Sequence, residues 1–207
     1  MVIHINNKTM KNISLVLTIA ALMVCCDKDN YIDSGTHEQK HDCTVWEYFQ
    51  TDHVNWDSLI VMIKHAGMIE YFDGTNKDEI TIFAPTNHSI NQYLFQTLDD
   101  NGERFYEKVA DIPADECHEM LLSYMIHGKK FLQDFDYEVK GTQTGGTMEQ
   151  ALSGINLRVY RITSSFYDIP DLGAEKLAFQ APEGYIGTVA SCNIEMNNGV
   201  VHSLDAT

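Results

Sequence analysis

The residues best suited to metal chemistry lie close together near the start of the 207-residue chain. His37, His41 and Cys43 follow the pattern His-x3-His-x-Cys, in which two imidazoles four residues apart could share a helix face and bind zinc. No apolar periodicity supports a helix there, and no second pair of ligands follows at a standard zinc spacing. A flexible tether is the favoured interpretation of this segment, and we expect no metal.

Candidates for acid–base chemistry are also few. The stretch 168–171 has aspartates at both ends and could hold a cation, although a simple turn explains the same residues. Asp99-Asp100 and Asp115-Glu116 are adjacent acids, which point in different directions and fit loop and helix-start roles better than a catalytic carboxylate pair. His202 lies among apolar residues and is interpreted as a structural histidine. Because the common hydrolase, metalloprotease and phosphate-loop motifs are missing as well, we expect neither an enzyme nor a cofactor.

The element that organises the chain is a short buried strand that leads into a helix. Ile80–Phe83 is β-branched and aromatic, and Ala84-Pro85 ends the run because proline cannot donate to a strand ladder. The following stretch, 88–95, has apolar residues at helical spacing. We expect Thr86 to form the corner and Asn87 to cap the helix by accepting from the N–H groups of its first turn.

Helical patterns dominate the first half of the chain and alternating patterns the second half, which indicates an α+β fold. Expected helices are 45–49 (capped by Thr44, with Glu47 completing a capping box), 57–66 (ended by Gly67), 103–110, and a helix starting at Pro113 and running to Gly128. Strands are expected around Phe131, Phe135, Tyr137 and Val139, over 147–152 and 155–162 as a hairpin, and over 177–180, 186–194 and 200–204, with a turn at 141–146.

Two segments carry a family resemblance. The sequence ITIFAPTNHSI, from Ile80, resembles the first signature motif of the fasciclin-like domain family, and NNGVVHSLD, from Asn197, resembles its second. Leu121–Lys129 resembles the segment between them. The resemblance implies one fasciclin-like domain over 44–207, with N-terminal helices packed on a β-sandwich or wedge formed mostly by the C-terminal half. The motif residues, structural with possible interaction roles, are Phe83, Ala84, Pro85, Thr86, Asn87, Tyr124, Asn198, Gly199, Val200 and His202.

The resemblance also implies a function. Fasciclin-like domains are mostly extracellular or cell-surface modules for adhesion and for binding proteins or matrix, without catalysis. Some members have a Tyr-His pair in the middle segment that is linked to adhesion, whereas here Met125 follows Tyr124 and the histidine is His127. No specific adhesion site is therefore carried over. An accessory glycan-binding lipoprotein of a nutrient-uptake system remains the alternative. The candidate ligand-contacting aromatics are Tyr137, Phe166, Tyr167 and Tyr185.

The N-terminus resembles the signal peptide of bacterial lipoproteins. A short positive region, Met10–Asn12, precedes the apolar run Ile13–Val24, which is too short for a comfortable membrane span. Cys26 is the expected lipidation site, so 1–25 is a signal peptide, 26–43 a tether, and the protein an outer-membrane lipoprotein, facing either the cell surface or the periplasm. Translation could start at Met1 or Met10.

Composition limits the partners further. An apolar fraction of 44% is enough for a packed core, and the formal net charge of −16 leaves no basic surface for nucleic acid or anionic lipid. Membrane attachment is therefore expected through the lipid alone, and the partner is expected to be an extracellular or cell-envelope protein or glycan. Cys117 and Cys192 lie in apolar segments and are interpreted as free thiols. With Cys43 they make three cysteines in the mature chain, so at most one disulfide could form.

Overall fold

The computed structural model describes residues 40–167, 169–170, 173–182 and 184–204. The expected signal peptide, Cys26 and most of the tether lie outside these residues, as does His37 of the histidine–cysteine cluster. Within the described residues, no helix is long and apolar enough to cross a membrane. Lys40 pairs with Glu195, and the N–H of His41 donates to the Glu195 carbonyl at 2.8 Å, so residues from Lys40 onward already contact the fold.

The helices come early, and their ends are fixed by side-chain caps. Thr44 and Glu47 form the expected capping box at the start of α2. Asp52 accepts from the N–H groups of Val54 and Asn55, so the next helix begins four residues earlier than the apolar pattern alone indicated. The helices are α2 (Val45–Phe49), α3 (His53–His65), α4 (Ile69–Phe72), α5 (Asn87–Gln96) and α6 (Ala114–Ser123), with short 3-10 helices η1 (Val109–Asp111) and η2 (Leu132–Asp134).

The strands form one large sheet and a small hairpin, confirming the α+β class. The sheet order is β2-β1-β9-β8-β7-β6-β5, in which β1 and β9 pair in parallel and the other neighbours are antiparallel. The strands are β1 (Ile80–Ala84), β2 (Met125–His127), β5 (Thr147–Gln150), β6 (Asn156–Thr163), β7 (Glu175–Gln180), β8 (Ile186–Met196) and β9 (Gly199–Leu204), with β3 (Glu138–Val139) and β4 (Thr144–Gly145) as the hairpin.

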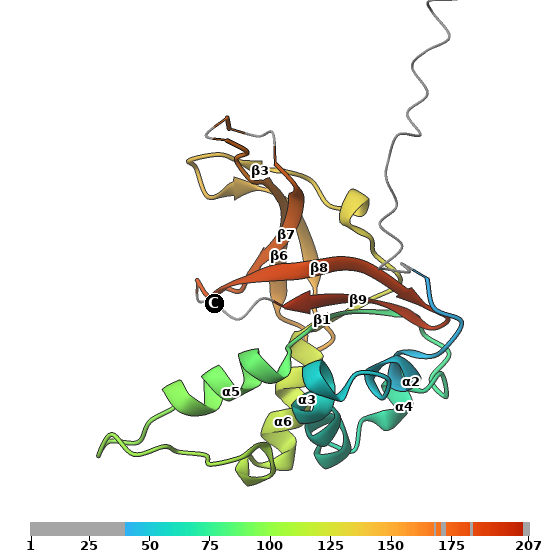
Figure 1. Ribbon diagram of the computed structural model, residues 1–207, viewed down its shortest axis with the longest axis vertical. Coiled ribbons are helices and arrows are strands. Elements are labelled where there is room, and N and C mark those ends of the chain that lie inside the picture. The colour runs from blue at the N-terminus through green and yellow to red at the C-terminus, as the bar shows by residue number, and fades with distance from the viewer. Residues whose placement is uncertain (1–39, 168, 171–172, 183, 205–207) are drawn as a thin grey trace, which may run out of the picture. The chain divides into compact units, whose positions relative to one another are not determined.

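Two hydrophobic cores lie on either side of the central strands. The helices pack together on one side of β1 and β9, while β6 and β7 extend away from the helices (Figure 1). A second core, which includes Phe83, Phe135 and Phe179, lies between the two halves of the sheet. A bridge between Ile126 and Ala151 brings the sheet's first and last strands together, so the sheet curls almost into a barrel around this second core.

The structure corrects three expected elements, and each correction has a local cause. Residues 103–110 do not form the expected helix and contain only the start of η1, because the Asp99 carboxylate accepts from the N–H groups of Asn101 and Glu103 and fixes a turn before them. Helix α6 ends at Ser123 and not at Gly128, because Met125–His127 pairs with β1. The segment around Phe131 forms η2 and not a strand, because the Asp134 carboxylate accepts from the Phe131 N–H.

Candidate binding surface

The first motif places its aromatic residue in the second core. Phe83 and Ala84 are fully buried on β1, and the Phe83 ring lies 5.2 Å from that of Phe179 and 5.5 Å from that of His202. Pro85 then ends the strand. Thr86, expected to form only a corner, is the N-cap of α5, because its hydroxyl accepts from the Ser89 N–H at 3.3 Å. These side chains hold the strand and the helix in place and offer no reactive group to solvent.

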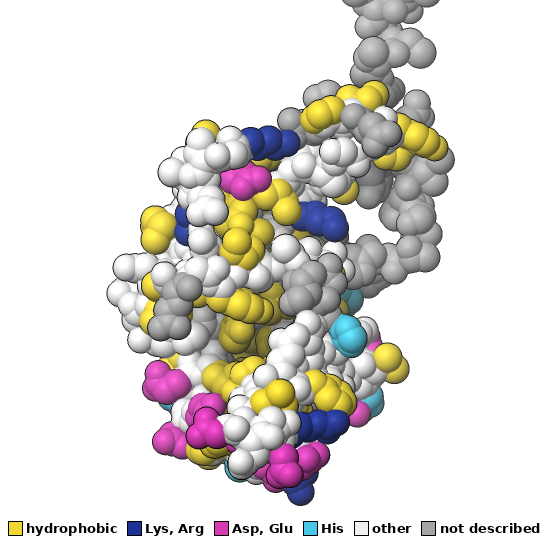
Figure 2. All heavy atoms as spheres, turned by 90° about the vertical axis from the view of Figure 1, so that its left-hand side faces the viewer, with side chains coloured by type: hydrophobic (Ala, Val, Ile, Leu, Met, Phe, Trp, Pro, Cys, Tyr) yellow, Lys and Arg dark blue, Asp and Glu magenta, His cyan; other side chains and the backbone are white. Residues whose placement is uncertain are grey.

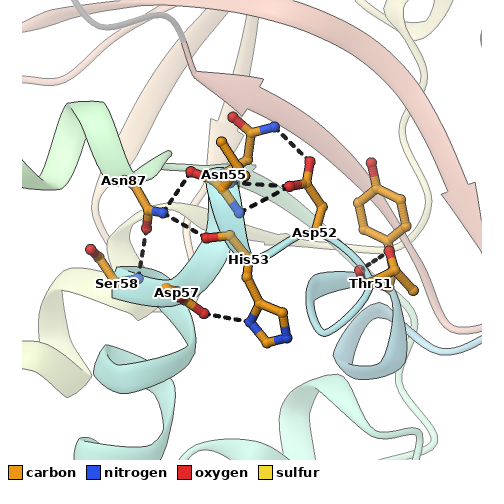
Figure 3. A network of polar contacts seen from close by, with 9 residues as sticks. Thr51, Asp52, His53, Asn55, Asp57, Ser58 and Asn87 are labelled. Carbon is orange, nitrogen blue, oxygen red and sulfur yellow. Dashed lines mark hydrogen bonds and ion pairs between the residues drawn. The ribbon is translucent and has the colours of Figure 1, made fainter.

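The prediction for Asn87 is wrong, and its actual role connects two helices (Figure 3). Its side-chain oxygen accepts from the Ser58 N–H at 2.6 Å, and its amide nitrogen donates to the carbonyls of Val54 at 2.7 Å and His53 at 3.0 Å. Val54 and Ser58 are four residues apart, the spacing of partners in a regular α-helix. The Asn87 amide therefore bonds both members of such a pair and fastens the start of α5 to the first turn of α3.

The second motif has the same structural character. The side-chain oxygen of Asn198 accepts from the Val45 N–H, and its amide nitrogen donates to the Phe72 carbonyl, both at 2.8 Å, so one side chain joins α2 and α4 to the turn before β9. A Cβ on Gly199 would lie 2.6 Å from the Ile80 carbonyl oxygen, so only glycine fits beside β1. Val200 is fully buried on β9.

His202 is a structural histidine in the second core. Its Nδ1 accepts from the Asn193 N–H at 3.3 Å and its Nε2 donates to the Lys130 carbonyl at 3.0 Å, so the ring is neutral. Burial lowers the pKa of His202 to about 4, although its bond to the Lys130 carbonyl acts in the opposite direction. Asn193 has φ of +64° within a register shift of β8. Its side-chain oxygen accepts from the Leu132 N–H of η2, and its own N–H donates to His202. These two bonds stabilise the register shift in β8.

Tyr124, the motif residue between the two signatures, is largely enclosed. Its ring meets that of Phe179 edge to face at 5.9 Å, and Tyr185 lies near its hydroxyl. Burial, and then the neighbouring Tyr185, raise the pKa of Tyr124. The neighbouring His127 is exposed and pairs with Ile80 across β2 and β1, so Tyr124 and His127 do not form a joint site.

The four aromatic candidates are all exposed: Tyr137 by 45%, Phe166 by 54%, Tyr167 by 85% and Tyr185 by 53%. The structure brings three of them to one end of β6 and β7. Phe166 and Tyr167 lie in the loop between these strands, and the Tyr137 hydroxyl donates to Glu175 at the start of β7. Together with Ile169, which bridges Phe166, they form what we call the β6–β7 loop patch.

Tyr185 lies elsewhere, in the turn between β7 and β8, which is the opposite end of β7. A further exposed set was not predicted from the sequence. Phe95, Leu98 and Phe105 project from α5 and the loop after it, where the Arg104 guanidinium lies 3.9 Å from the centre of the Phe95 ring. Of these, Phe105 lies in the stretch 103–110, which was expected to be helical. The signal available in the sequence was the run Asp99-Asp100-Asn101-Gly102, which is typical of a turn.

Comparison with known proteins decides the family. The sequence model of the fasciclin domain matches residues 55–207. The chain belongs to the fasciclin domain family. Among solved structures, it is similar to a FAS1 domain pair from the insect cell adhesion molecule fasciclin I, with a TM-score of 0.42 and 13% sequence identity over 78% of this chain and 44% of that chain. No curated protein matches the sequence.

Fasciclin domains are generally extracellular, non-catalytic modules for adhesion or for binding other proteins. In this fasciclin domain the signature residues are buried or engaged in bonds between elements, so they explain the fold and leave the binding surface to other residues. Within the described part of the chain, no three histidine, cysteine or acidic side chains gather as metal ligands. The described cysteines, Cys43, Cys117 and Cys192, have free thiols, and Cys117 is fully buried.

Proposed function

We propose that this fasciclin domain is a non-catalytic adhesion module of the bacterial cell envelope that recognises a protein or matrix partner through the β6–β7 loop patch. The chain is attached to the outer membrane by a lipid on Cys26, and the described domain is presented beyond a tether. Family membership supports the general class of function. The lipid anchor rests on the N-terminal sequence pattern alone.

One observation carries the choice of surface. The Phe166 and Tyr167 rings project side by side from one loop, with the latter 85% exposed. Large apolar side chains gathered at a loop tip lose water when a partner covers them, and aromatic residues supply much of the binding energy at interfaces. Tyr137, in the same patch, is less free to meet a partner, because the Arg161 guanidinium lies over its ring, 3.9 Å from the ring centre.

The geometry of the patch favours a protein over a glycan. The Phe166 and Tyr167 rings meet at 82°, so they do not present one flat platform on which a sugar chain could stack. The Tyr137 ring has one face covered by Arg161. Edges and faces at mixed angles suit the irregular apolar side chains of a protein surface.

The anchor is tested by labelling cells with an alkyne-tagged palmitate. The wild-type chain and a Cys25→Ser variant should take up the label, and a Cys26→Ser variant should lose it and leave the membrane fraction. Label retained by Cys26→Ser would contradict the proposed anchor. Protease treatment of intact cells then tests orientation, since an adhesion module must be cleaved from outside.

The patch is tested separately, by the retention of cells on surfaces coated with collagen, fibronectin or a polysaccharide. A Phe166→Ser/Tyr167→Ser variant should reduce retention on a protein coat at least roughly tenfold, as expected when interface anchors are lost. Phe105→Ser is the control, because it removes a ring that is 61% exposed from the α5–α6 loop. Equal loss in both variants would exclude the patch, and retention on polysaccharide alone would favour the glycan alternative.

A further inference from the structure

A cavity of about 310 Å³ opens between the helices and the sheet, at the opposite end of β7 from the β6–β7 loop patch. It lies between α5, α6 and the turn that joins β7 to β8. In Figure 2 hydrophobic side chains gather in a hollow in the middle of the face, with acidic side chains over the helices below. We infer that this cavity is a binding site for a small, uncharged aromatic molecule that carries one hydroxyl or carbonyl oxygen.

The walls favour an aromatic ligand. Tyr93 and Tyr124 contribute rings, and Met62 and Met120 contribute thioethers, all of which contact the cavity. Aromatic rings attract one another edge to face or offset, and methionine sulfur makes favourable contacts with ring edges. Methionine also adjusts its shape to a flat guest, because its side chain is unbranched and flexible.

Two tyrosine side chains at the cavity can orient the ligand. Tyr124 and Tyr185 both line it and lie near one another. A hydroxyl of this pair can donate its proton to an oxygen of the ligand. Tyr93 is less suited to this role, because its hydroxyl already donates to Glu116 at 3.3 Å.

The charge distribution selects an uncharged ligand. The residues that line the cavity include no acidic or basic side chain, so an ion entering it would lose water without gaining a partner of opposite charge. The chain as a whole has a formal net charge of −16, so carboxylates, including those of fatty acids, are further disfavoured. An uncharged aromatic with one oxygen meets both conditions.

The test uses the full chain with Cys26→Ser, so that no attached acyl chain competes for the cavity, and 2-naphthol as the probe. Titration calorimetry should give one binding site with a Kd on the order of 0.1–1 mM, as expected for a ligand of this size. Gln92→Trp places an indole in the cavity from half-buried α5 and should weaken binding at least tenfold. His88→Trp adds the same side chain at an exposed position one turn earlier and should leave binding unchanged.

Tyr185→Phe tests the polar contact without changing the fold-forming residues, and should weaken 2-naphthol binding several-fold while leaving naphthalene binding unchanged. Several outcomes would overturn the inference. The first two are no binding of 2-naphthol, and binding that Gln92→Trp does not weaken. The third is binding of 2-naphthoate as tight as that of 2-naphthol. The fourth is tighter binding of 1-decanol than of 2-naphthol, since 1-decanol has the same number of non-hydrogen atoms but no ring. Since the β6–β7 loop variants do not touch this cavity, failure here and failure of the adhesion proposal are separable.

Discussion

Two regions of this fasciclin domain use similar residues for opposite purposes. The first, which we call the junction, comprises Phe83, Asn87, Asn198 and His202, and holds helices and strands to one another. The second is the β6–β7 loop patch. Junction side chains are enclosed or bonded to elements far away in sequence, whereas the patch places aromatic rings in water. The comparison indicates that the motif residues stabilise the fold, and that the residues that bind a partner lie outside the motifs.

The two phenylalanines offer the sharpest test of this comparison. Phe83→Ala should lower the free energy of unfolding by about 3–5 kcal/mol, because it leaves a cavity between Phe179 and His202. Phe166→Ala removes the same atoms from a side chain that is already half in water, and should change stability by less than about 0.5 kcal/mol. Urea unfolding of both variants measures the difference. Similar losses in the two variants would show that the patch is part of the core.

The junction should also be the acid-sensitive region. His202 titrates near its ordinary value of 6.5 in the unfolded chain, and only at about 4 in the folded chain. The unfolded state therefore binds the proton first, so stability is full above about pH 6.5 and falls by about 3 kcal/mol as the pH drops toward 4.

Unfolding curves between pH 7 and 4 check this expectation. The pH-dependent loss should be much smaller in His202→Gln, whatever the stability of that variant at pH 7. His88→Gln, at an exposed position, is the control and should keep the wild-type slope. An unchanged slope in His202→Gln would assign the acid sensitivity to other groups.

Asn87 and Asn55, both shown in Figure 3, allow a bond between two helices to be compared with a bond within one helix start. Asn87→Ala leaves the Ser58 N–H and the Val54 and His53 carbonyls without this partner and should cost about 2 kcal/mol. Asn55→Ala removes an exposed bond to Asp52 within a single helix start and should cost less than about 0.5 kcal/mol. Thermal unfolding distinguishes the two, and equal effects would contradict the proposed role of Asn87 as a tie between helices.

The sequence predicts the junction's elements better than its contacts. The strand at Ile80 follows from a continuous β-branched and aromatic run, the strands after residue 147 from local alternation, and the Thr44 capping box from a four-residue pattern. The partners of Asn87 lie about thirty residues earlier in the chain, so local capping rules assigned it a role that Thr86 performs. Met125–His127 continued a helical pattern but pairs with β1, because strand pairing across the sheet outweighs local preference.

The exposed aromatics were predicted as candidates, but their grouping was not. Tyr137 lies about thirty residues before Phe166, and only the pairing of β6 with β7 brings Glu175, its hydrogen-bond partner, alongside. The same topology sends Tyr185 to the other end of β7, where it lines the cavity instead. The cavity itself needs residues from α3, α5, α6 and β9, so no single stretch of sequence predicts it.

No loss of stability is expected where the backbone of the patch is strained. Tyr167 has φ of +48°, a left-handed conformation that is costly for an aromatic residue and that glycine adopts freely. Tyr167→Gly should therefore leave the thermal midpoint unchanged or raise it, with a gain of no more than about 1 kcal/mol. The same change should reduce cell retention on the protein coat. The Tyr167 side chain is 85% exposed, so the combination of a stable fold and lost adhesion would assign Tyr167 to recognition. A loss of stability would instead place the loop tip among the folding determinants, together with the junction.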